Sequence, residues 1–224
     1  MRKAIEVYPD YSSAKAILAW CTTLRVSWQS SSEHEALREK GVRLCNEALE
    51  SAQRDIESEA YAGYTLAFHM RDIQRGMDLV ANAVEYCPSF AWAWTSRSFL
   101  ESFFGDPHRG LEFGERALRL NPRDPLIFRT FHAVTTAYIG IGDYQKALDT
   151  AREGLKYNSN ILALQLQKVS ALARMQCIEE ARAEAKNLLN RYPEFRISRF
   201  LSYRGKFQSS AGMADDLRAS GLPE

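Results

Sequence analysis

A short motif recurs along this chain and constrains its fold more than any other sequence feature. It is AIEVYP at 4–9, AVEYCP at 83–88, ALRLNP at 117–122 and LLNRYP at 188–193, and GLKYNS at 154–159 is a variant that lacks the proline. The last three intervals between closing residues, from 88 to 122, 159 and 193, are 34, 37 and 34 residues long. The first interval, from 9 to 88, is 79 residues and has room for two units. A fixed period of about 20–50 residues predicts stacked supersecondary repeats.

Each repeat is predicted to hold two helices joined by a turn. The segment 91–104 contains no helix breaker and meets Gly105, Asp106 and Pro107, which together favour a turn. Asp143 is a plausible N-cap for the helix that follows it. The same design predicts further helices over 108–120, 125–142, 143–157, 162–176 and 178–192. The sequence therefore predicts an all-α protein.

Small residues recur at spacings of three and four along the second helix of each predicted pair. Such spacing places each set on one helical face, where a small side chain lets the paired helix approach closely. Glycine inside a helix costs up to ~1 kcal/mol relative to alanine, so its recurrence indicates a packing role. The sets are Gly76, Val80 and Ala83; Gly110, Gly114 and Ala117; Ala147, Ala151 and Gly154; and Ala181, Ala185 and Leu188.

The period, the small-residue sets and the closing proline together resemble the tetratricopeptide repeat (TPR) family. This resemblance implies a right-handed α-solenoid of about five helix pairs with a C-terminal capping helix. The chain departs from the family pattern at Ser98 and His132, and in an insertion around 26–38. We predict a single array over 1–224, with a partial leading helix at 1–9, repeats at 10–54, 55–88, 89–122, 123–159 and 160–193, and a cap at 194–224.

The two ends of the chain suggest a larger context. The segment 1–9 has the pattern of a second helix without its first helix, so we expect the chain to be part of a longer protein. The ending LRASGLPE (217–224) is similar to the closing segment of bacterial TPR domains that follow adenylate cyclase-type or winged-helix domains. This similarity implies the regulatory C-terminal part of a bacterial signalling protein.

The resemblance also implies where a partner would bind, because first helices line the concave groove of TPR proteins. The predicted groove residues are Trp92, Thr95, Ser96, Phe99, Phe103, Arg129, Thr130, Gln167 and Arg174, with Ala133, Thr136, Leu166 and Ser170 on the same faces. Trp92, Phe99 and Arg129 are expected at its centre, since aromatic residues beside arginine are a common hot-spot composition. The alternative is that Trp92 and Phe99 pack against neighbouring helices. Trp94 lies two residues from Trp92 and is expected in the core.

Several features argue against other classes of function. The 29 Lys and Arg nearly balance the 28 Asp and Glu, so the chain lacks the basic excess typical of nucleic-acid binding. Its apolar runs are shorter than the ~18 residues of a membrane span. The four histidines are scattered and predict neither a metal site nor a cofactor site. Four distant cysteines predict buried thiols and a reducing cytoplasm; they are Cys21, Cys45, Cys87 and Cys177.

Two other segments carry open alternatives. The polar stretch around Trp28 (27–32) is predicted as a long loop, with docking as the alternative. The basic and aromatic stretch 191–207 is predicted as a solvated cap, with an anion patch as the alternative.

The sequence therefore predicts a non-catalytic scaffold that binds a protein or peptide, and that also self-associates through apolar surface at 1–9 and in the aromatic groove. The alternative is a small-ligand-binding or enzymatic domain with a pocket in the concave surface.

Overall fold

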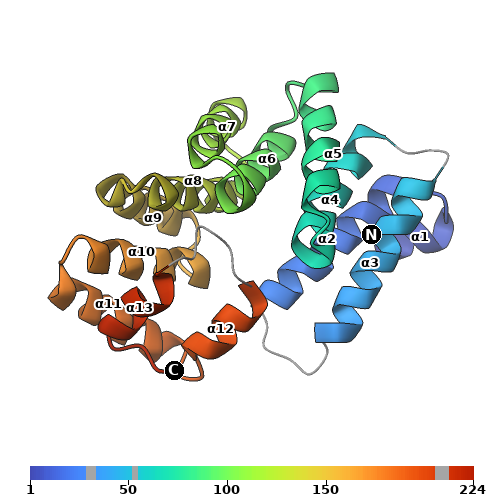
Figure 1. Ribbon diagram of the computed structural model, residues 1–224. Coiled ribbons are helices and arrows are strands. Elements are labelled where there is room, and N and C mark those ends of the chain that lie inside the picture. Colours follow the sequence, from blue (N-terminus) through green and yellow to red (C-terminus); the bar gives the residue numbers. More distant parts are fainter. Residues whose placement is uncertain (29–33, 52–54, 205–211) are drawn as a thin grey trace. The chain divides into compact units, whose positions relative to one another are not determined.

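The computed structural model describes residues 1–28, 34–51, 55–204 and 212–224, and in these ranges all regular secondary structure is helical (Figure 1). The helices of the first half are α1 (Arg2–Val7), α2 (Ser12–Trp28), α3 (His34–Glu50), α4 (Ile56–Thr65), the π-helical turn η1 (Leu66–Met70) and α5 (Ile73–Tyr86). The others are α6 (Ala91–Phe104), α7 (Pro107–Leu120), α8 (Ile127–Ile141), α9 (Tyr144–Tyr157), α10 (Leu162–Arg174), α11 (Ile178–Arg191), α12 (Ile197–Arg204) and α13 (Met213–Ala219).

Each predicted repeat range contains one pair of helices, with α2, α4, α6, α8 and α10 as the first helices. The chain divides into two compact units, Met1–Leu100 (unit 1) and Glu101–Glu224 (unit 2), and the division falls within α6. The single-array boundaries stay a prediction. Several helix bounds differ from expectation by one or more residues. Helix α8 begins at Ile127 rather than Pro125, and helices α2 and α3 extend into the predicted insertion.

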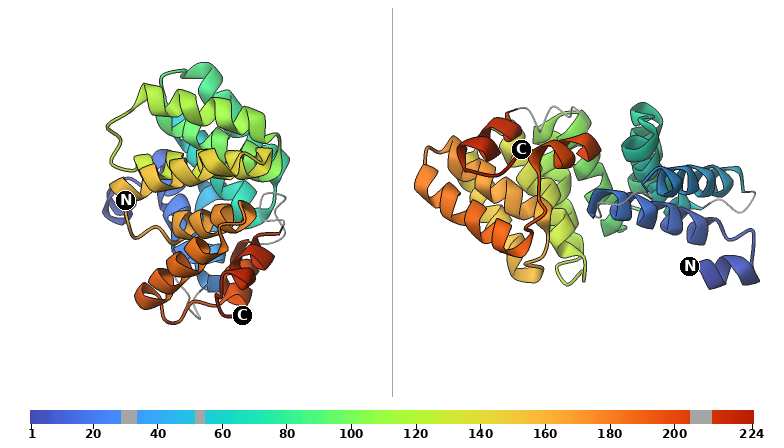
Figure 2. Two further views of the ribbon diagram at one scale, coloured as in Figure 1. Left: turned by 90° about the vertical axis from the view of Figure 1, so that its left-hand side faces the viewer. Right: turned by 90° about the horizontal axis from the view of Figure 1, so that it is seen from below.

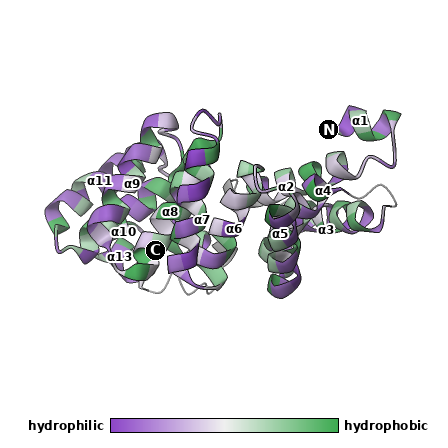
Figure 3. Cartoon of the chain, turned by 90° about the horizontal axis from the view of Figure 1, so that it is seen from above, coloured by the Kyte–Doolittle hydropathy of each residue, from purple (hydrophilic) through white to green (hydrophobic). Residues whose placement is uncertain are grey.

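The small-residue sets of the second helices are buried, as predicted. Val80, Ala147, Ala151 and Ala181 are fully inaccessible to solvent. Between α4 and α5 backbone meets backbone, and a Cβ atom added to Gly76 would lie 2.5 Å from the carbonyl oxygen of Gly63. Glycine is needed here because the two backbones are in contact. In Figure 3, α5 and α7 each carry both hydrophilic and hydrophobic residues, as amphipathic helices do.

Each unit has its own apolar core. In unit 1, residues of α2, α3, α4 and η1 form a buried cluster: Ala19, Leu44, Cys45, Leu49, Ala62 and Leu66. In unit 2, the larger cluster joins α8, α9, α10, α11, α12 and α13, and its fully buried members include Leu166, Leu172, Ile197, Met213 and Leu217. Both views of Figure 2 show the C-terminal end of the chain beside the α10–α11 pair.

Helix starts follow the predicted turn chemistry. Asp106 caps α7, with its side chain accepting from His108 N at 2.8 Å, and Pro107 occupies the first helical position. Asp143 caps α9 by accepting from Lys146 N at 3.1 Å, which confirms the prediction. Buried Glu101 accepts from Asp106 N at 3.2 Å and pairs with Arg109 at 3.3 Å, so it fixes the α6–α7 turn from the inside.

The turns between helices allow a first test of the fold. Gly142 ends α8 in the left-handed region (φ 88°), and no atom lies within 4 Å of the Cβ atom it lacks. We expect Gly142→Ala to destabilise the protein by about 1 kcal/mol, through backbone conformation alone. Gln176 holds a left-handed conformation (φ 62°) in the α10–α11 turn. Gln176→Gly should therefore raise the free energy of unfolding by up to ~1 kcal/mol. Urea denaturation measures the change in both variants. Equal effects of the two changes would contradict this account.

Candidate functional site

The first helices of unit 1 meet in a cluster of aromatic rings. The Tyr61 ring of α4 lies 3.7 Å from the Trp92 ring of α6, centroid to centroid, at an interplanar angle of 34°. Trp20 of α2 lies 5.3 Å from Tyr61 and 5.6 Å from Trp92, the latter edge to face at 89°. The two contacts of Trp20 have separations that are favourable for aromatic pairs. The cluster thus joins one side chain from each of three successive first helices.

A second set of rings surrounds this centre. Tyr64 stacks on Phe68 of η1 at 4.5 Å and meets Phe99 edge to face at 5.8 Å. Phe90, which precedes α6, lies 6.3 Å from Trp92 at 28°. Tyr61, Phe68 and Phe90 are half-buried, so each of these three residues is partly accessible to solvent. We call these three residues the aromatic surface of unit 1.

The groove residues predicted in unit 1 are less exposed than a groove lining would be. Trp92 is 9% exposed, Phe99 2%, Thr95 5% and Ser96 0%. These values favour the packing alternative for Trp92 and Phe99, because their rings contact aromatic side chains of the preceding first helices. The partner-binding role stays a prediction for this set. Trp94 is buried, as predicted, and its Nε1 donates to the Pro88 carbonyl oxygen at 2.9 Å.

The groove residues predicted in unit 2 are also mostly buried. Phe103, Arg129 and Thr130 are each 4% exposed, and Gln167 is 1% exposed. Gln167 Nε2 donates to Thr136 Oγ1 at 2.7 Å, which links the first helices α8 and α10. His132 is half-buried and lies edge to face with Phe103 at 6.2 Å. The face predicted to bind a partner is therefore used here for contacts between repeats.

Arg174 was predicted at the edge of the groove, and the structure shows it bound within the chain. Its Nε donates to Asp216 Oδ2 of α13 at 2.7 Å. Ser170 Oγ donates to the same oxygen at 2.6 Å. No sequence pattern indicated this pairing, since 42 residues separate Arg174 from Asp216. Helix α13 (Met213–Ala219) lies in the predicted C-terminal cap at 194–224.

The π-helical turn η1 holds a buried histidine that sequence reasoning did not single out. His69 is 4% exposed, and neither Nδ1 nor Nε2 has a hydrogen-bond partner in the part of the chain that the structure describes. Burial, together with the positive charges of Arg38 and Arg71, lowers the pKa of His69 to about 4. Arg71 follows in the left-handed region (φ 58°), where this repeat lacks a turn glycine. Only the missing glycine could have drawn attention to this turn.

The cysteines are free, but only one is buried. Burial raises the pKa of Cys45 to about 12, which leaves the thiol protonated and inert. Cys21, Cys87 and Cys177 are half-buried, so the prediction of four buried thiols was wrong for these three. Side chains of His, Cys, Asp and Glu do not gather into a metal-binding group within the described ranges. In those ranges, too, no helix combines the length and apolar character that a membrane span requires.

Two predicted features fall partly outside the described residues. The loop around Trp28 lies largely in 29–33, beyond the part that the structure describes. The basic and aromatic stretch 191–207 is described only in part. In that part Phe195 is buried and packs 6.1 Å from Phe200, as the capping prediction expects, while Arg191, Arg196 and Arg199 are exposed.

Comparison with solved structures identifies the architecture. TTC0263, a thermophilic TPR protein of Thermus thermophilus, superposes with a TM-score of 0.61 at 16% identity, over 75% of this chain and 90% of that one. The chain has a tetratricopeptide-repeat fold. YrrB, a TPR protein with an unusual peptide-binding site, gives 0.53 at 16% identity over 79% and 92%. MamA (AMB-1) gives 0.52 at 12% identity over 83% and 95%.

At these identities the likeness concerns the fold, and the predicted all-α TPR-like class is confirmed. No protein-family model matches the sequence, and a search of curated proteins found no match.

Proposed function

We propose that this chain is a non-catalytic module that binds a protein or peptide through the aromatic surface of unit 1. The observation that carries the proposal is the arrangement of Tyr61, Phe68 and Phe90. Phe68 and Phe90 each stack on a buried aromatic side chain, and Tyr61 packs at a tilt against Trp92, so each residue is held by a buried ring. A rigid aromatic anchor loses little conformational entropy on binding, so such rings suit recognition of apolar side chains.

This proposal changes the roles within the groove predicted from the sequence. Trp92 and Phe99 are the buried residues that pack behind the aromatic surface of unit 1. The residues of that surface contact the partner. In unit 2 the buried groove residues hold α8 and α10 together, and Arg174 is engaged by α13. The TPR fold itself supports an interaction module, and one structural neighbour, YrrB, is described as having a peptide-binding site.

The wider context is also part of the proposal. The similarity of LRASGLPE (217–224) to the ends of bacterial regulatory TPR domains supports a role in a cytoplasmic bacterial signalling protein, beside an adenylate cyclase-type or winged-helix domain. Self-association through the N-terminal segment is supported by α1, which buries none of its residues. Val7 is 79% exposed, and Tyr8 and Tyr11 are 49% and 45% exposed. Exposed apolar side chains of this kind favour association.

Selection from a displayed peptide library tests the binding proposal. We expect the chain to select peptides with large apolar side chains, and we expect Phe68→Ala and Phe90→Ala each to weaken their binding by about 30-fold, as loss of a hot-spot anchor does. Tyr86→Ala is the matched control, because Tyr86 is an aromatic residue with 75% exposure on the second helix α5. Binding measured by fluorescence anisotropy should be unchanged in that variant.

Melting temperatures of all three variants separate lost contacts from lost structure. The proposal would be rejected if the selected peptides bound the Phe68 and Phe90 variants as tightly as the wild type. It would also be rejected if Tyr86→Ala weakened binding to the same extent.

A further inference from the structure

The C-terminal helix α13 lies on the first helix of the last repeat, α10. Two of its side chains, Met213 (1% exposed) and Leu217 (0% exposed), enter the apolar cluster of unit 2. Gly212 begins the helix in the left-handed region (φ 76°), and an added Cβ atom there would lie 3.0 Å from Arg174 Nη2. The helix therefore lies close against the side of α10 that carries Arg174.

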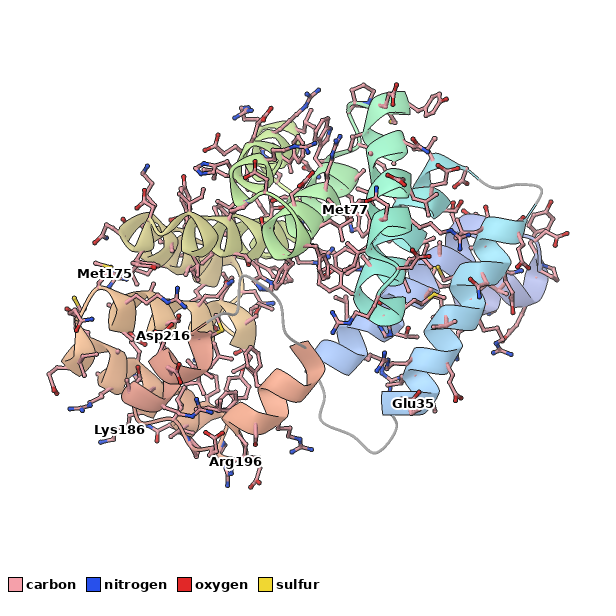
Figure 4. All side chains as sticks on the ribbon, in the orientation of Figure 1. Glu35, Met77, Met175, Lys186, Arg196 and Asp216 are labelled. Carbon is pink, nitrogen blue, oxygen red and sulfur yellow. The ribbon has the colours of Figure 1, made fainter. Side chains whose placement is uncertain are left out.

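One carboxylate anchors this contact. Asp216 lies on α13, where Figure 4 labels it. Its Oδ2 accepts from Ser170 Oγ at 2.6 Å and from Arg174 Nε at 2.7 Å. The side chains of Arg174 and Asp216 are only 17% and 15% exposed, so the ion pair is largely shielded from water. Tyr144 orients the arginine, with the guanidinium carbon 5.4 Å from the ring centroid and Nη1 3.4 Å from the hydroxyl oxygen. Charge-assisted hydrogen bonds in such surroundings are stronger than neutral ones.

The side of α10 that α13 covers is the one that the sequence assigns to partner binding. Leu166, Ser170 and Arg174 recur every four residues and so form one stripe along α10. Helix α13 places the Asp216 carboxylate on two residues of this stripe, Ser170 and Arg174. Its Met213 and Leu217 side chains join the apolar cluster that also contains Leu166.

We infer that α13 is an intramolecular ligand for the first-helix face of α10. The chemistry of the contact identifies the ligand class as a short amphipathic helix with one carboxylate, placed between Ser170 and Arg174, and apolar side chains three residues before it and one after it. A partner helix with that pattern binds this face in place of α13. The inference rests on the proposed function in supposing an external partner, but the occupancy by α13 does not depend on it.

The short length of α13 supports this role. A helix of seven residues is unstable alone in water, so α13 depends on its contacts with the rest of unit 2. Attachment to the same chain gives α13 an effective concentration on the order of millimolar. An external helix of equal intrinsic affinity would therefore need a similar concentration to compete. A substitution that weakens the binding of α13 to α10 should lower the concentration of external helix needed for displacement by the same factor.

A labelled peptide with the sequence of residues 212–224 (GMADDLRASGLPE) tests the inference on the full-length chain. We expect the double variant Asp216→Ala/Leu217→Ala to bind this peptide at least about tenfold more tightly than the wild type, whose face is occupied in cis. Asp215→Ala is the matched control, because Asp215 lies on the exposed side of α13 and pairs with Arg218. Adding Arg174→Ala to the double variant should abolish the gain in peptide binding.

Three results would overturn the inference. They are equal peptide affinity in wild type and double variant, a gain that survives Arg174→Ala, and loss of the helical circular-dichroism signal in the double variant, which would make α13 an indispensable part of the core. The two proposals can fail separately. The peptide experiment tests only the face of α10 in unit 2, whereas the Phe68 and Phe90 variants test only the aromatic surface of unit 1.

Discussion

Phe99→Ala should lower the free energy of unfolding by about 3–5 kcal/mol, the cost of removing a large ring from a close-packed core. Phe99 is 2% exposed, and its ring meets that of Tyr64 edge to face at 5.8 Å. Truncation to alanine would remove this contact and leave a cavity beneath the aromatic surface of unit 1. Chemical denaturation followed by circular dichroism measures the loss, and the helical signal at low denaturant shows whether the variant still folds.

The same variant separates the two interpretations of the aromatic residues on α6. If Phe99 were mainly a partner anchor, truncation would weaken peptide binding and leave unfolding nearly unchanged. The exposed aromatic control, Tyr86→Ala, should change the free energy of unfolding by no more than ~0.5 kcal/mol. A stability change in Phe99→Ala as small as this would contradict the structural assignment. It would restore Phe99 as a candidate anchor.

The repeat architecture was predictable because it depends on local rules. A helix pair needs small residues where two backbones approach, and buried Gly76, Gly110 and Ala147 occupy equivalent places 34 and 37 residues apart. The capping residues Asp106 and Asp143 bond to backbone groups only two or three residues away. Interactions of this range are visible in a linear sequence, so helix pairs and turns were assigned without long-range information.

The candidate site was less predictable because burial depends on what faces each helix. Helical periodicity correctly placed Trp92 and Phe99 on one face of α6, but it could not show that rings from α2 and α4 lie against that face. Arg174 had the composition of a groove residue, and its partner Asp216 comes from a separate helix 42 residues later. Such pairings require knowledge of how distant segments fold back on one another.

The turn η1 illustrates a second limit. Its five π-helical residues are followed by Arg71 in the left-handed region, a position where Gly142 serves the α8–α9 turn. A sequence without glycine at such a turn must strain a larger residue or change the winding of the helix. Here both occur, and the His69 side chain within this turn is buried. No local motif predicts which side chain is buried by such a change.

Burial of His69 predicts a loss of stability in acid. The folded protein holds the pKa of His69 at about 4, below the value of about 6.5 for an exposed histidine. Above pH 6.5 the imidazole is neutral in both the folded and the unfolded chain, and His69 does not affect the pH dependence of stability. As the pH falls from 6.5 towards 4, the unfolded chain binds a proton that the folded chain excludes. Stability therefore decreases across this window by about 3 kcal/mol in total.

His69→Leu isolates this contribution, because it removes the titrating group and fills the site with an apolar side chain of similar size. The free energy of unfolding, measured by urea denaturation at pH 7 and pH 4.5, should fall by about 2–3 kcal/mol more in the wild type than in the variant. Other carboxyl and histidine groups affect both proteins alike, so the difference between the two reports His69. The exposed His108 provides the control, since His108→Gln should retain the wild-type dependence. Parallel pH profiles for the wild type and His69→Leu would show that the folded protein accommodates a charged imidazole. In that case Arg38 and Arg71 would have to move away from the ring on protonation, because two nearby cations oppose a third in the same interior turn.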